Sequence, residues 1–108
     1  MKIMRGDSYP IYIELLQDNT ILAPEMVAEI EVCIGESMRK LYSRNEVMFD
    51  QSSGRWYIRP SQQETLAWTE SAYNVIARVK YANMDLPEVL GMNVGRINVV
   101  DTFSKEVI

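Results

Sequence analysis

Carboxylates are the residues whose spacing could support chemistry in this chain, because the sequence contains no histidine. Without imidazole, catalytic triads, histidine metal sites and histidine acid–base catalysis are excluded. Glu29 and Glu31 would project from one face of a strand, where two carboxylates can bind a hard cation or act as an acid–base pair. Two acids on the wet face of a strand are more commonly just solvated. Asp85 and Glu88 flank a loop and could bind calcium, but no glycine-rich ligand series accompanies them.

The other reactive groups have simpler interpretations. Cys33 is the single cysteine and lies in an apolar run, so we expect a buried, inert thiol and no disulfide. Arg5-Gly6-Asp7 matches a tripeptide read by cell-surface integrins, but a strand entry with a flexible glycine explains it equally. The serine hydroxyls have no base partner. We therefore predict no catalytic, cofactor-binding or metal-binding residue, and a protein that is not an enzyme.

Four aromatic residues are the candidate partner-binding residues: Tyr12, Trp56, Tyr57 and Trp68. Aromatic side chains on a sandwich can stack on sugars, and they can also anchor a protein interface. Tryptophan in a sandwich is often simply part of the core, together with a neighbouring tyrosine. The sequence leaves these three interpretations open.

Residues 72–81 form the central element around which the rest is arranged. If this stretch is extended, one side carries Tyr73, Val75, Ala77, Val79 and Tyr81, and the other side is polar apart from Ile76. An apolar period of two predicts a strand with one face on a core. A competing helix over residues 61–82 is rejected because β-branched and aromatic residues are concentrated in its second half.

Turn signals divide the rest of the chain into short strands. We predict strands at residues 9–16, 20–22, 27–35, 38–43, 46–50, 55–59, 88–90 and 94–101. In residues 27–35 the inward side is expected to carry Ala28, Ile30, Val32 and Ile34. Helical turns are predicted at Pro24–Met26 and, from a capping box at Ser61 and Glu64, at residues 61–66. Residues 83–87 are predicted to be a loop, and residues 91–93 a bend.

These elements predict an all-β fold, an antiparallel immunoglobulin-like β-sandwich of seven to nine short strands with one or two helical turns, as a single domain over residues 1–108. The net charge is −4 and the basic residues are spread thinly, which argues against nucleic-acid binding. There is no signal-peptide pattern and no apolar run near the ~20 residues that span a bilayer. We expect a soluble protein made in the cytoplasm and not inserted into a membrane.

Four stretches together resemble a known family. They are Met4-Arg5-Gly6-Asp7, the strand from Ala28 to Gly35, the run from Gly54 to Thr65, and the closing strand from Gly91 to Asp101. The pattern is similar to bacteriophage and prophage structural domains, in particular the immunoglobulin-like N-terminal domain of phage baseplate upper proteins. A Gly-Asp start, a sandwich and a Ser/Thr-Gln-Glu-Glu-Thr-like turn recur there. Here the turn is Ser61-Gln62-Gln63-Glu64-Thr65, so a glutamine replaces one acid.

The resemblance implies a non-enzymatic tail- or baseplate-associated protein made in the bacterial cytoplasm, and it leaves open whether the protein is a virion component or an assembly helper. Its partners would be other phage structural subunits or further copies of itself, contacted through the Trp56/Tyr57 hairpin and the tyrosine-rich central strand. The chain stops at Ile108 without the stalk or receptor-binding region of longer family members, so host recognition is not implied. The alternatives are a carbohydrate-binding β-sandwich module and, given three or more acids on one face, a metal-dependent hydrolase.

Overall fold

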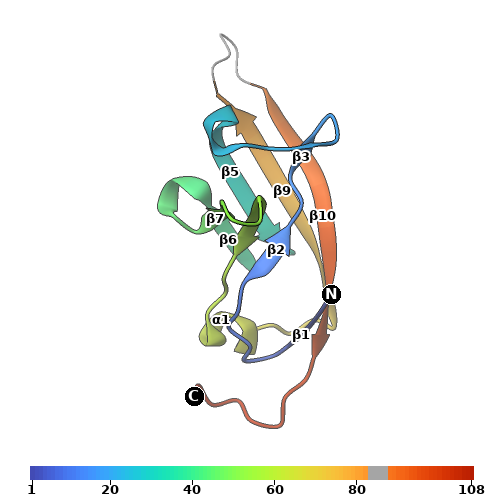
Figure 1. Cartoon of the computed structure of the whole chain (residues 1–108). Coiled ribbons are helices and arrows are strands. Elements are labelled where there is room, and N and C mark those ends of the chain that lie inside the picture. Colours follow the sequence, from blue (N-terminus) through green and yellow to red (C-terminus); the bar gives the residue numbers. More distant parts are fainter. Residues whose placement is uncertain (83–87) are drawn as a thin grey trace.

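The computed structural model describes residues 1–82 and 88–108 and shows an all-β, sandwich-like protein (Figure 1). In chain order its elements are β1 (Lys2–Met4), β2 (Ile11–Ile13), β3 (Leu16–Gln17), β4 (Thr20–Ile21), the 3-10 turn η1 (Pro24–Met26), β5 (Val27–Ile34), β6 (Met38–Leu41), the 3-10 turn η2 (Tyr42–Arg44), β7 (Val47–Asp50), β8 (Arg55–Ile58), α1 (Gln62–Leu66), β9 (Ala72–Tyr81) and β10 (Val89–Val100). The predicted loop at residues 83–87 lies outside the described residues.

Two main sheets enclose the core. The larger has five strands in the order β1-β10-β9-β5-β6, and the smaller has three in the order β2-β8-β7. Figure 1 shows β5, β9 and β10 side by side as one long layer, with β2 and β7 in front of it. The buried apolar side chains of both sheets form one cluster between the layers. The strands β3 and β4 form a separate small hairpin.

The central strand β9 confirms the predicted alternation. Tyr73, Val75, Ala77, Val79 and Tyr81 are all buried, and the residues between them are exposed. β9 pairs antiparallel with β5 on one side and with β10 on the other. β9 contains no bulge of its own, so its side chains alternate strictly between the two faces of the sheet. The tyrosines of β9 therefore belong to the core, which corrects the expectation that this strand offers them to a partner.

The inward side of β5 differs from the prediction because this strand contains a bulge. Ile30, Val32 and Ile34 are buried as expected, but Ala28 is exposed and Val27 is buried instead. The register against β9 shifts between Val27 and Glu29, so Ala28 is an extra residue that changes the side of everything before it.

The last strands also differ from the prediction. Residues 89–100 form one continuous strand instead of two strands separated by a bend. A bulge between Asn93 and Gly95 accommodates one extra residue, and the strand pairs with β9 on both sides of it. The amide of Gly95 donates to the side-chain oxygen of Asn93 at 3.0 Å, which stabilises this bulge. β1 pairs with the far end of β10 in parallel, so the larger sheet is not purely antiparallel.

The predicted helical turns are confirmed. The amide of Glu64 donates to the hydroxyl of Ser61 at 3.1 Å, and the amide of Ser61 donates to the carboxylate of Glu64 at 2.9 Å. These two bonds satisfy free amides at the start of α1, which ends at Leu66. The hairpin between β7 and β8 is confirmed as well.

Candidate functional site

The two tryptophans among the candidate binding residues lie in the core. Trp56 is 0% exposed and Trp68 is 2% exposed. Trp56 faces inward because it alternates with the outward-facing Arg55 and Tyr57 along β8. Its indole nitrogen donates to the carbonyl of Leu22 at 2.7 Å. This placement corrects the expectation that Trp56 and Trp68 present their rings to a partner, and it agrees with the alternative that tryptophan fills the core.

The two tyrosines lie on the outer face of the smaller sheet and are half-buried. Tyr12 of β2 is directly opposite Tyr57 of β8, and Met48 of β7 is opposite Tyr57 on its other side. The Tyr12 and Tyr57 rings have their centroids 5.6 Å apart and are tilted by 51°. The guanidinium carbon of Arg55 lies 3.9 Å from the centre of the Tyr12 ring. We call Tyr12, Met48, Arg55 and Tyr57 the outer patch.

The geometry of the outer patch suits a protein contact better than a sugar platform. A stacking platform for a pyranose ring requires open, nearly coplanar aromatic faces, and here the rings are tilted and Arg55 covers one face of Tyr12. Arginine over tyrosine is a cation–π contact, which also fixes the orientation of both groups. Sugar binding stays a prediction that a polysaccharide-binding assay would check.

The loop beside the outer patch is anchored by Asp50. Its carboxylate accepts hydrogen bonds from the hydroxyls of Ser52 and Ser53 at 2.7 and 2.9 Å. These bonds, that from Ser52 first, lower the pKa of Asp50 below its ordinary value. Asp50 is paired in the ladder with Arg55. These contacts stabilise the turn that precedes Arg55.

The carboxylates Glu29 and Glu31 project from one strand as predicted, but each is already bound. Glu31 forms ion pairs with Arg39 at 2.5 Å and with Arg78 at 2.7 Å. The bond from Arg39 and the further contacts with Arg78 lower the pKa of Glu31, against the opposite effect of partial burial. Glu29 accepts from the amide of Ser43 at 2.9 Å and from its hydroxyl. Partial burial raises the pKa of Glu29, but these bonds outweigh it and leave the pKa below its ordinary value.

No metal site is found in the part of the chain that the structure describes, where no three acids or cysteines gather closely enough to hold an ion. Asp85 of the proposed calcium pair lies outside those residues. Cys33 is half-buried on the outer face of β5 rather than fully buried, because it alternates with Val32 and Ile34. Burial, followed by the charge of Glu31, raises the pKa of its thiol.

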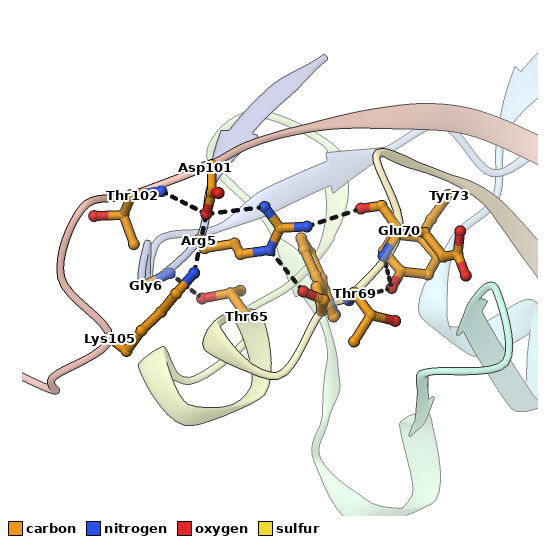
Figure 2. A network of polar contacts seen from close by, with 10 residues as sticks. Arg5, Gly6, Thr65, Thr69, Glu70, Tyr73, Asp101, Thr102 and Lys105 are labelled. Atoms are coloured by element: carbon orange, nitrogen blue, oxygen red, sulfur yellow. Dashed lines mark hydrogen bonds and ion pairs between the residues drawn. The ribbon is translucent and has the colours of Figure 1, made fainter.

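The Arg5-Gly6-Asp7 tripeptide forms contacts with other residues of the same chain. Figure 2 shows the Arg5 side chain between Asp101 and Glu70. It donates to the carbonyls of Trp68 at 2.6 Å and Glu70 at 3.3 Å and forms an ion pair with Asp101 at 3.2 Å. Only 13% of the Arg5 side chain is exposed. These contacts give the tripeptide a structural role, as the strand-entry interpretation expects.

Sequence reasoning missed Met48 and Arg55 of the outer patch. Both belong to the side of their strands opposite the buried residues, so the alternation in residues 47–58 was the available signal. Arg55 lies over Tyr12, more than forty residues earlier in the chain, and Met48 lies opposite Tyr57. Both arrangements follow from strand order, which the alternation does not specify.

No helix among the described residues is long and apolar enough to cross a membrane. Comparison with known proteins found no matching family model, no similar curated protein and no similar solved structure.

Proposed function

We propose that this chain is a non-enzymatic structural protein, a phage or prophage tail or baseplate component that acts by contacts with other protein subunits. The observation that supports the proposal best is the outer patch, where Tyr12, Tyr57 and Met48 form one row across the three strands of the smaller sheet. Tyrosine, methionine and arginine are enriched in protein interfaces, where aromatic residues and arginine often dominate the binding energy.

The outer patch is also preorganised. Its row of side chains is held by the β2-β8-β7 ladder, and the stacking of Arg55 on Tyr12 orients these two side chains. Binding at this surface costs less side-chain entropy than ordering isolated side chains, because the Tyr12–Tyr57 and Arg55–Tyr12 contacts already restrict these groups in the free protein. The partner that this chemistry fits is a protein surface with apolar groups for the two rings and an acceptor for Arg55.

Purified virions from the source strain would test the proposal. We expect the chain to be present in assembled particles, and we expect a Y12A/Y57A double variant, supplied in place of the normal chain, to be lost from them. Y9A is the matched control, because Tyr9 is an exposed tyrosine 43% accessible and outside the outer patch. Absence of the unaltered chain from particles, or polysaccharide binding that requires Tyr12 and Tyr57, would overturn the proposal.

A further inference from the structure

The outer edge of β10 is only partly covered. β10 pairs with β9 through residues 89–98, but β1 covers its other side only from Asn98 to Val100. Within the described residues no strand pairs with the outer side of residues 89–94. Figure 1 shows β10 at the margin of the larger sheet, with β1 at its lower end. A free edge of this kind is a template for another strand.

The hydrogen-bonding groups on this edge can be assigned. The amide of Tyr81 donates to the carbonyl of Glu88 at 3.1 Å, so Glu88 directs its backbone groups toward β9. Along an antiparallel strand, the N–H and C=O groups of successive residues point alternately to the two sides. Leu90 and Met92 therefore also direct these groups toward β9, whereas Val89, Gly91 and Asn93 direct them outward.

The edge lacks the protection that the other side of the sheet has. No charged residue and no proline occurs from Val89 to Gly95. At the opposite margin, β6 carries Arg39 and Lys40, charges that discourage strand addition. On β10, Val89 and Leu90 are 55% and 49% exposed. Apart from the bulge between Asn93 and Gly95, where the free segment ends, this edge of the larger sheet is unprotected.

We propose that the free edge of β10 pairs antiparallel with the same edge of a second copy of the chain, through a two-fold axis at Gly91. This surface is separate from the outer patch. In this register Val89 lies opposite Asn93 of the second copy, and Gly91 lies opposite its own equivalent. All three residues direct their backbone groups outward, so each can exchange both hydrogen bonds with its counterpart.

Side chains also favour a second copy as the occupant. The register places Leu90 opposite Met92, an apolar pair repeated by symmetry, on the core side of the joined sheet. No two like charges lie opposite each other in this register, because Glu88 is opposite the uncharged Val94 of the second copy. Gly91 has no side chain to obstruct the axis, and the neighbouring Arg78 is bound to Glu31. Because the free segment is short, we expect a reversible dimer that dissociates on dilution.

Two charge variants test this register. V89K/N93K would place lysines opposite each other across the axis, and V89K/N93E would place each lysine opposite a glutamate. Both variants replace Asn93, whose side-chain oxygen accepts from the amide of Gly95, so the free energy of unfolding of each variant is measured alongside its association. Sedimentation equilibrium should show a dimer for the unaltered chain, a dissociation constant raised about tenfold or more for V89K/N93K, and association retained in V89K/N93E.

Amide hydrogen exchange locates the contact. The amides of Val89, Gly91 and Asn93 should become protected as protein concentration rises, while that of Leu90, which faces β9, should not change. A strict monomer at millimolar concentration would overturn the inference. So would a dimer that V89K/N93K does not weaken, or one that V89K/N93E weakens equally, since the interface would then lie elsewhere or involve another segment such as residues 102–108.

Discussion

Gly35 lies directly against the ring of Tyr73. A Cβ atom added to Gly35 would be 2.6 Å from Cδ1 of that ring, closer than such atoms approach in proteins. The ring cannot easily retreat, because the Tyr73 hydroxyl accepts hydrogen bonds from the amides of Thr69 and Glu70 at 3.0 and 3.1 Å (Figure 2). Gly35 also has a φ of 52°, in the left-handed region. The turn between β5 and β6 thus requires glycine for two independent reasons.

A G35A variant is expected to lower the free energy of unfolding by about 2–4 kcal/mol, from left-handed strain together with the overlap with Tyr73. Urea unfolding followed by tryptophan fluorescence measures this. G54A is the matched control: Gly54 has a φ of 68°, but its nearest neighbour would be 3.8 Å from the added Cβ. Only the strain remains there, and we expect about 1–2 kcal/mol. Equal losses in the two variants would contradict the role of Tyr73.

The two buried tryptophans should respond differently to replacement by phenylalanine. Trp56 donates to Leu22, so W56F leaves a buried carbonyl without its partner as well as a cavity. We expect a loss of about 2–4 kcal/mol.

Trp68 provides the comparison, because its indole nitrogen is buried and has no hydrogen-bond partner among the described residues. W68F removes a donor that is desolvated without compensation, which offsets part of the cavity cost. We expect W68F to cost at least about 1 kcal/mol less than W56F. Thermal unfolding of both variants checks the order, and a W68F variant less stable than W56F would show the interpretation to be wrong.

Glu31 should make stability depend on pH in the acid range. Its pKa is lower in the folded protein than in the unfolded chain, so its contribution is fully present above the unfolded value, roughly pH 4.3, and is lost as pH falls through the folded pKa. Urea midpoints from pH 7 to pH 3 should therefore fall less steeply for E31Q than for the unaltered chain, and E31Q should be the less stable of the two at pH 7.

E14Q is the control for this experiment, because Glu14 is an exposed carboxylate on the connection after β2. Its profile should stay close to that of the unaltered chain. An E31Q profile parallel to that of the unaltered chain throughout would mean that the two arginines do not stabilise ionised Glu31.

Alternation of side chains predicted much of the fold, and strand pairing accounts for what it did not predict. The inward residues of β9 followed directly from the sequence, because that strand has no irregularity. The exposure of Ala28 and the continuity of β10 depend on bulges, and a bulge is visible only against the partner strand. For the same reason the sequence identified the four candidate aromatic residues but did not show which of them are buried. Which of them reach the surface depends on the register of β2, β8 and β7.

The pairing of β1 with β10 sets the order in which the protein can be completed. Lys2 lies beside Asn98, and the N-terminal ammonium donates to the carbonyl of Arg96 at 3.3 Å. Ile3 and its neighbour Val99 are 96 positions apart in the sequence, so β1 cannot pair until residues 98–100 have been synthesised. The Ile3 side chain must therefore stay unburied while all the strands between β1 and the end of β10 are made, and contacts between such distant residues form slowly. β1 is thus synthesised before its partner strand and must wait for it.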